Sequence, residues 1–269
     1  MKRFELVNAI QEKRSFLCVG LDTDPDQIPL HLKEKENGIF EFNRQIIDKT
    51  KDHCVAYKIN TAFYEAMGSK GWDIMEQTVH HIPSTHFKIA DAKRGDIGNT
   101  SARYAKAFFQ TIPFDAITVA PYMGEDSIRP FLEYENKWTI LLGLTSNPGA
   151  ADFELQQLKS GEQLFEKVIK TVSAWGNPDN LMFVTGATQA AALEGIRSII
   201  PDHFLLVPGI GFQGGSLPEV VRYGMNKDTG LLVNVSRAII YAGEQENFDT
   251  EAGEIARQYH EEMSSLMPL

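Results

Sequence analysis

This sequence is poor in cysteine, lacks long apolar runs and carries fewer basic than acidic residues. Its only two cysteines, Cys18 and Cys54, both lie in apolar segments. That placement favours buried free thiols in a reducing compartment over a disulfide framework. No window approaches the roughly 18 consecutive apolar residues of a membrane helix, and the first residues lack the apolar core of a signal peptide. We therefore expect a cytoplasmic protein that does not associate with membranes.

The charge balance limits the possible partners. The chain has 26 Lys and Arg against 36 Asp and Glu, which gives a net charge of −10. A negative protein repels nucleic acids, so we expect no nucleic-acid partner. Any anionic substrate would need a local cluster of Lys, Arg and backbone N–H groups. The composition is that of an ordinary globular protein, and no low-complexity linker interrupts it, so we expect one domain spanning 1–269.

Short apolar runs alternate with amphipathic segments along the chain. The runs lie at 16–22, 54–60, 86–93, 116–123, 138–146, 181–188, 204–211 and 230–236. Several are rich in β-branched residues, as expected for strands buried on both faces. Eight such runs separated by helical segments indicate parallel βαβ units. At this length, they predict a closed (β/α)8 TIM barrel rather than an open doubly wound sheet.

The segments between the runs contain further signals. Segments 71–82 and 160–175 place apolar residues at helical spacing, which predicts amphipathic helices. Ser216, followed by Leu-Pro-Glu, predicts a helix N-cap with an acidic first turn. In contrast, segment 24–38 is polar and contains proline, so we expect a loop after the first strand.

Polar residues gather where the predicted strands end. Active sites of such barrels lie at the C-terminal ends of the strands, so these positions are the candidates for chemistry. They are Asp22, Lys58, Asp91, Lys93, Pro121, Ser146, Thr188, Gly209, Gly211, Ser236 and Arg237. Ordinary strand-to-helix loops would supply glycine, asparagine and serine, but not two lysines and several aspartates. The pattern therefore indicates an active site at this end of the barrel.

Asp91 and Lys93 form the most informative pair. Side chains repeat every two residues along a strand, so both are expected on the same side. A neighbouring carboxylate favours the ammonium form of lysine, and an ammonium held against a reacting carbon can donate a proton. A solvated charge run before a helix is the alternative, but the buried run that precedes Asp91 argues against it. We therefore predict that Lys93 is a catalytic acid.

Lys58 lies inside the apolar run at 54–60. A buried lysine is costly unless it is paired with a carboxylate. Asp22 and Asp91 are the candidate partners, and both remain open at this point. An alternating array of lysine and aspartate would let each charge offset its neighbour.

A glycine-rich segment, PGIGFQGG at 208–215, follows the seventh predicted strand. Glycine lets the backbone approach an anion closely and present its N–H groups. Arg237 ends the eighth predicted strand, and barrels of this kind commonly bind phosphate in the loops after strands seven and eight. We therefore predict a phosphate site that includes Pro208, Gly209, Gly211 and Arg237.

A third polar segment, TSNPG at 145–149, follows the fifth predicted strand. Its hydroxyl and amide groups suit hydrogen bonding to a planar polar ring. The same residues are also ordinary turn formers, and both interpretations remain open.

Several motifs occur together in a specific order. They are VGLD (19–22), YKIN (57–60), DAKRGDIGNT (91–100), TSNPGA (145–150), PGIGFQGG (208–215) and NVSRAI (234–239). Their order and spacing resemble the orotidine 5′-phosphate decarboxylase family, and the DAKRGDIGNT form resembles a bacterial subgroup of it. Gly98 stands where many relatives outside that subgroup carry proline, a difference that puts no catalytic residue in doubt.

The resemblance implies a role for each matching residue. Lys93 would protonate C6 of the pyrimidine ring as carbon dioxide leaves, with Asp91, Lys58 and Asp96 completing a charged array. Asp22 and Lys58 would contact the ribose hydroxyls, and Ser146 would contact the ring. Gln213 and Arg237 would bind the phosphate. Asp96, Ile97 and Thr100 would reach into the site of a partner subunit. The resemblance thus implies a homodimer with shared sites that converts orotidine 5′-phosphate to UMP without a metal or an organic cofactor.

Two other functions compete with this one. Sugar-phosphate decarboxylases and aldolases of the same superfamily use Mg²⁺ and carry an acidic metal ligand at the end of strand two. Here that region reads Tyr57-Lys58-Ile59-Asn60, and an ammonium would repel a metal ion. A non-catalytic nucleotide-binding barrel is the second alternative, but a sensor needs no proton donor such as Lys93. The histidines also lack metal-ligand spacing, so we expect no metal site.

Overall fold

The computed structural model describes residues 1–211 and 214–268. Within them, eight parallel strands close into a barrel in which each strand pairs with its neighbours in sequence, and β8 pairs with β1. The strands are β1 (Leu17–Gly20), β2 (Ala56–Asn60), β3 (Phe87–Arg94), β4 (Ala116–Val119), β5 (Trp138–Leu144), β6 (Leu181–Thr185), β7 (Phe204–Pro208) and β8 (Leu231–Val235). The predicted (β/α)8 TIM barrel is confirmed.

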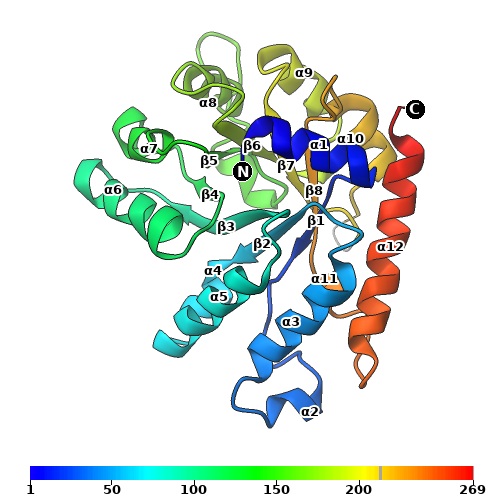
Figure 1. Cartoon of the computed structure of the whole chain (residues 1–269). Helices are drawn as coiled ribbons and strands as arrows, with labels where there is room; N and C mark the ends of the chain where they lie inside the picture. Colours follow the sequence, from blue (N-terminus) through cyan, green and yellow to red (C-terminus); the bar gives the residue numbers. More distant parts are fainter. Residues whose placement is uncertain (212–213, 269) are drawn as a thin grey trace.

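Helices surround the barrel (Figure 1). They are α1 (Arg3–Lys13), α2 (Leu30–Lys33), α3 (Gly38–Thr50), α4 (Thr61–Glu65), α5 (Ser69–His81), α6 (Gly98–Lys106), α7 (Glu125–Leu132), α8 (Leu164–Ser173), α9 (Ala192–Ile199), α10 (Leu217–Gly224), α11 (Arg237–Ile240) and α12 (Phe248–Leu266). A π-helical turn (η1, Ala107–Thr111) and two 3₁₀ turns (η2, Pro148–Asp152, and η3, Ala187–Gln189) complete the elements. The side chain of Ser216 accepts a hydrogen bond from the Glu219 N–H, which confirms the predicted N-cap.

Two predictions about helices need correction. Segment 24–38 is not wholly a loop, because it contains α2 and the first residue of α3. Leu32 packs fully buried in the core, and this tertiary contact supports a short helix that the polar composition of the segment conceals. Helix α8 also begins later than predicted, at Leu164, where Gln163 and Glu166 form a capping box.

The core is built from strands that are buried on both faces. All residues of β1, β4, β6 and β8 are buried, which explains their continuous apolar character. Cys18 and Cys54 are both buried free thiols, as expected. Burial is the main reason that the pKa of each thiol is raised, so neither one is a reactive thiolate.

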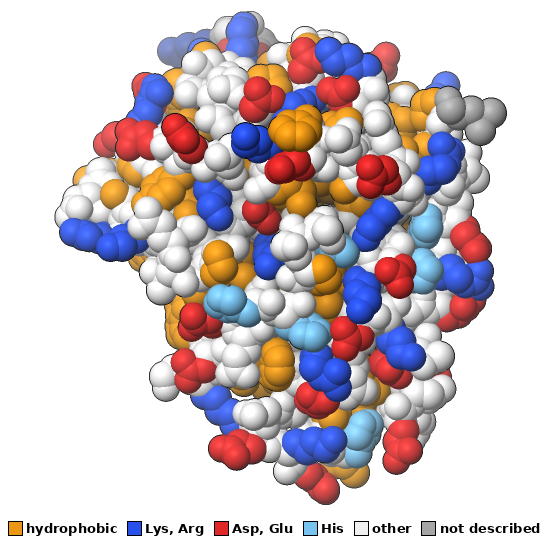
Figure 2. All heavy atoms as spheres, in the orientation of Figure 1, with side chains coloured by type: hydrophobic (Ala, Val, Ile, Leu, Met, Phe, Trp, Pro, Cys, Tyr) orange, Lys and Arg blue, Asp and Glu red, His pale blue; other side chains and the backbone are white. Residues whose placement is uncertain are grey.

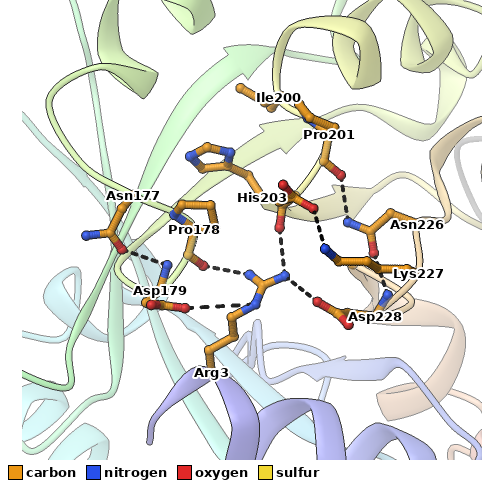
Figure 3. A network of polar contacts seen from close by, with 12 residues as sticks. Arg3, Asn177, Pro178, Asp179, Ile200, Pro201, His203, Asn226, Lys227 and Asp228 are labelled. Carbon is orange, nitrogen blue, oxygen red and sulfur yellow. Dashed lines mark hydrogen bonds and ion pairs between the residues drawn. The ribbon is translucent and has the colours of Figure 1, made fainter.

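The N-terminal helix α1 is tied to the end of the barrel where the strands begin (Figure 3). The Arg3 guanidinium donates to the carbonyl oxygens of Pro178 and Asp202 at 2.6 and 2.7 Å and to Asp228 Oδ2 at 2.9 Å. It also lies over the Phe204 ring, 5.1 Å from the centroid. These residues precede or begin β6, β7 and β8, so the Arg3 side chain links α1 to the starts of three strands.

The surface carries both signs of charge. Figure 2 shows Lys and Arg side chains interspersed with Asp and Glu on the face seen in Figure 1. Within the described part of the chain, no helix combines the length and apolar character needed to cross a membrane.

Candidate active site

A cavity of about 330 Å³ opens where the strands of the barrel end. Its wall is formed by Asp22, Lys58, Asp91, Lys93, Leu142, Thr145, Ser146, Asn147, Val184, Leu206, Pro208, Gly209, Ile210, Asn234, Val235, Ser236, Arg237 and Ala238. Most of the residues that the sequence placed at strand ends therefore share one cavity. Pro121 and Thr188 follow their strands but are not part of this wall.

Lys58 lies at the centre of the charged side of the cavity. Its side chain is only 5% exposed, and Nζ lies 3.1 Å from Asp22 Oδ1 and 3.1 Å from Asp91 Oδ2. Burial alone would lower the pKa of Lys58, but the attraction of Asp22 and Asp91 outweighs it and raises the pKa above its ordinary value. The two candidate partners are thus both partners, and Lys58 is a permanent cation.

Asp91 binds a second lysine through its other oxygen. Lys93 Nζ lies 2.5 Å from Asp91 Oδ1. Burial opposes ionisation of Asp91, but Lys58 and Lys93 together lower the pKa of its carboxyl well below the ordinary value. Asp91 is therefore a fixed anion that holds two ammonium groups, and the predicted alternation of lysine and aspartate is present.

The backbone at Lys93 departs from a regular strand. Lys93 has φ +46°, a left-handed conformation that costs a non-glycine residue about 1–3 kcal/mol. The pairing of β3 with β4 is also irregular here, with a shift in register between Ala90 and Arg94. The prediction that Asp91 and Lys93 lie together is confirmed, but regular alternation along the strand is not the whole reason. The turned backbone also directs the Lys93 side chain.

The glycine-rich segment contributes the opposite side of the cavity. Gly209 and Gly211 have φ of +102° and +80°, conformations that glycine adopts without strain. Gly209 lines the cavity and its carbonyl oxygen accepts a hydrogen bond from the Gly215 N–H at 3.1 Å, so the segment folds back on itself. Gly211 is not part of the wall, and Gln213 lies outside the described residues.

Arg237 lines the cavity beside this segment. The prediction that Arg237 ends β8 is wrong, because β8 ends at Val235 and Arg237 is the first residue of α11. Arg237 nevertheless lies just after β8, and its side chain reaches the cavity as predicted. Glycine backbone and a guanidinium on one side of a cavity are suited to a phosphate group.

Ser146 belongs to a braced segment after β5. The Thr145 N–H donates to Glu154 Oε2 at 2.7 Å, and the Thr145 hydroxyl donates to Glu154 Oε1 at 2.9 Å. Thr145, Ser146 and Asn147 all line the cavity, so Glu154 supports this part of the wall from behind. The sequence offered no signal for Glu154, which belongs to no motif.

The cavity also has an apolar strip that the sequence analysis did not identify. Leu142, Val184 and Leu206 lie side by side on β5, β6 and β7, paired in register. Asn234, on β8, adds a buried amide. Their common feature is an inward position a few residues before a polar strand end, and counting back from those ends could have found them.

Asp96, Ile97 and Thr100 lie apart from this wall. They follow β3, where Asp96 Oδ1 accepts a hydrogen bond from the Ile97 N–H at 2.7 Å and Gly98 begins α6. Ile97 is 55% exposed. Within a single chain the predicted group of four charges is therefore present only as Lys58, Asp91 and Lys93.

Among residues 1–211 and 214–268, no group of three or more His, Cys, Asp or Glu side chains is placed to hold a metal ion. Absence of a metal requirement therefore stays a prediction.

Comparison with known proteins gives a consistent relationship. The model of the orotidine 5′-phosphate decarboxylase / HUMPS family matches residues 15–248. The chain is similar to the orotidine 5′-phosphate decarboxylase of Phocaeicola vulgatus, with 58% identity over 99% of both chains, and to that of Bacteroides fragilis, with 56% identity over 99% of this chain and 98% of the relative. The solved OMP decarboxylase of Leishmania donovani is similar in structure, with a TM-score of 0.81 and 34% identity over 97% of this chain and 99% of that chain. The chain therefore belongs to the orotidine 5′-phosphate decarboxylase / HUMPS family.

Proposed function

We propose that this chain, as one catalytic domain, converts orotidine 5′-phosphate to UMP and carbon dioxide in pyrimidine biosynthesis. The observation that carries the proposal is the array in the cavity wall in which Asp91 holds both Lys58 and Lys93. The names of the relatives that match over nearly the whole chain support the same substrate.

The array meets the electrostatic requirement of this reaction. Loss of carbon dioxide from an sp² ring carbon leaves a localised anion, with no adjacent carbonyl group to accept the charge. Preorganised charges can stabilise such an anion, and Lys93 supplies a cation that also carries the proton. Lys93 donates that proton to C6 from Nζ as the bond to carbon dioxide breaks. Asp91 holds the ammonium in place through the 2.5 Å contact.

The remaining wall matches the other parts of the nucleotide. Asp22 and Lys58 form the ribose side, and Ser146 faces the pyrimidine ring from its braced segment. Gly209, with its left-handed backbone, and Arg237 bind the phosphate. In our proposal, Pro208, Gly211 and Gln213 complete the phosphate side. Phosphate binding far from the reacting carbon supplies energy that orders the site for the transition state.

We further propose a homodimer with shared active sites. Ile97, which follows β3, is an exposed apolar side chain next to Asp96. Tyr122 and Met123, which follow the adjacent strand β4, are also large and exposed, at 94% and 44%. Such a group of exposed apolar residues favours a subunit interface. Across this interface, Asp96, Ile97 and Thr100 complete the site of the partner subunit.

A cytoplasmic location completes the proposal. Both cysteines are free thiols, as is usual for proteins of a reducing compartment. The net charge of −10 argues against nucleic-acid partners.

The Mg²⁺-dependent sugar-phosphate enzymes remain the main competing function, because the family description includes more than one activity. Lys58 argues against them, since it lies on β2 (Ala56–Asn60), lines the cavity and has a raised pKa, which keeps a cation where a metal ligand would be needed. The test is the change in ultraviolet absorbance when purified protein meets orotidine 5′-phosphate, with and without EDTA. Turnover in both conditions supports the proposal. Absence of turnover in either of the two conditions would overturn the proposal.

A further inference from the structure

One hydroxyl group contacts both members of the catalytic pair. The Thr118 hydroxyl accepts a hydrogen bond from the Lys93 backbone N–H at 2.9 Å and donates one to Asp91 Oδ1 at 3.0 Å. A hydroxyl has one proton to donate and lone pairs to accept, so both bonds can exist at once. Thr118 belongs to β4, while Asp91 and Lys93 belong to β3.

The contact lies where the backbone is strained. Lys93 has φ +46°, and such conformations persist only when the surrounding structure holds them. Strand β4 and the residue after it hold this turn on both sides. Thr118 accepts a hydrogen bond from the N–H of Lys93, and the Ala120 N–H donates to the carbonyl oxygen of Arg94 at 2.8 Å. The Arg94 side chain is in turn paired with Glu65.

Burial makes the hydroxyl hard to replace. Thr118 is 1% exposed, so water has little access to the Lys93 N–H from that side. Without the hydroxyl, this N–H and one lone pair of Asp91 would lose their partner inside the protein. Thr118 is not part of the cavity wall and has no contact with substrate in our proposal.

We propose that Thr118 is a positioning residue of the catalytic pair. Its hydroxyl sets the left-handed turn that directs Lys93 toward the cavity and, through the same oxygen, fixes the Asp91 carboxylate that receives the ammonium. This inference rests on the proposed function, because it concerns the same lysine and the same reaction. It adds a residue on a neighbouring strand that acts only through Asp91 and Lys93.

The test compares three substitutions at one position. Thr118→Val and Thr118→Ala remove the hydroxyl, whereas Thr118→Ser retains it. We expect kcat for orotidine 5′-phosphate to fall about tenfold to a hundredfold in the Val and Ala variants, since small displacements of a catalytic group have effects of this size. KM should change less, because phosphate and ribose contacts remain. The Ser variant should retain most of the wild-type kcat.

Thr139→Val is the matched control. Thr139 is also a fully buried threonine on a barrel strand, but its hydroxyl has no hydrogen-bond partner within the described residues. It lies near the start of β5, away from the cavity. The control should show wild-type kcat, which separates a general effect of losing a buried hydroxyl from the specific effect at Thr118.

Hydrogen exchange gives a readout that does not depend on activity. The Lys93 amide should exchange faster in Thr118→Val than in wild type or Thr139→Val, because its hydrogen bond is lost.

Equal kcat in Thr118→Val and Thr139→Val would overturn the proposal, as would an equal loss in the Val and Ser variants. If Thr118→Val does not fold, the comparison of Ala with Ser decides in the same way. If wild type does not act on orotidine 5′-phosphate, the proposed function fails, and unchanged exchange at Lys93 would separately overturn the role of Thr118.

Discussion

Lys93 Nζ lies 2.5 Å from Asp91 Oδ1, although the Lys93 side chain is 50% exposed and that of Asp91 only 12%. The pair thus joins a half-exposed ammonium group to a largely buried carboxylate. Asp91 is held in turn by Lys58 and by Thr118, each from a different strand. The Asp91 carboxylate, held by these two groups, therefore fixes the position of the Lys93 ammonium.

The first prediction follows from this arrangement. Lys93→Ala should fold normally, because half of the lysine side chain is in solvent, but it should lose measurable turnover. Proton transfer alone typically contributes about 10²–10⁴-fold, and Lys93 also supplies the stabilising charge. Steady-state kinetics with orotidine 5′-phosphate, together with circular dichroism, measure both properties. A folded variant that keeps more than about a hundredth of the wild-type kcat would show that Lys93 is not the acid.

The second prediction tests the shared site. Homodimers of Lys93→Ala and of Asp96→Ala should each be nearly inactive. A heterodimer of the two has one site with both substitutions and one site with neither. Random reassortment makes about half of the dimers heterodimers, so about a quarter of the wild-type activity per site should return by simple counting of subunits. The measurement is activity after mixing, with subunit exchange verified by native mass spectrometry. Confirmed exchange without recovery would place Asp96 in the site of its own chain.

The third prediction concerns metal ions. Turnover should survive exhaustive chelation, because the described residues contain no set of three or more metal-ligating side chains. The measurement is kcat after dialysis against EDTA, with metal content determined by mass spectrometry of the same sample. Loss of activity that Mg²⁺ restores would instead favour the sugar-phosphate enzymes.

The fourth prediction concerns pH and His203. Burial, followed by repulsion from Arg3 and Arg197, lowers the pKa of His203 to about 4. The unfolded chain binds this proton near pH 6.5, whereas the folded protein resists it, so the free energy of unfolding should fall between pH 6.5 and 4. One such histidine contributes about 3 kcal/mol at most. Neither ring nitrogen has a partner within the described residues, and the ring packs against Phe183.

His203→Phe tests this linkage. Removing the titrating group without leaving a partner unpaired should flatten the decline in stability across this range. Urea unfolding at several pH values between 4 and 7, for wild type and variant, measures the difference. Identical slopes for the two proteins would show that His203 is not responsible for any part of the decline.

The fifth prediction concerns the attachment of α1. Arg3→Ala should lower the free energy of unfolding by about 2–4 kcal/mol, because it removes three charged hydrogen bonds and leaves the Pro178 and Asp202 carbonyls unpaired (Figure 3). Arg129→Ala is the control. Arg129 pairs with Glu125 on the surface of α7, where both are about half exposed, so it should cost no more than about 0.5 kcal/mol. Urea unfolding measures both, and an equal effect would contradict the structural role of Arg3.

Much of the fold and the centre of the site could be predicted from the sequence. Strand and helix periodicity is a local property of the sequence. The alternation of continuous apolar runs with amphipathic segments was therefore enough to predict the barrel. Polar residues at the ends of those runs, such as Asp22 and Lys93, had to meet, because the ends of parallel strands converge in a closed barrel. The need of buried Lys58 for a carboxylate was likewise evident from its apolar neighbours.

Other features were decided only by tertiary structure. The sequence left Asp22 and Asp91 as alternative partners of Lys58, and the register between β1, β2 and β3 made both of them partners. The hydroxyl of Thr118 reaches Asp91 and Lys93 because β4 lies beside β3 with a local shift in register, 25 residues away from Lys93 along the chain. Such contacts depend on how separate strands align when the barrel closes. Local sequence carries the tendency to form each strand, but the alignment follows from packing of the whole core.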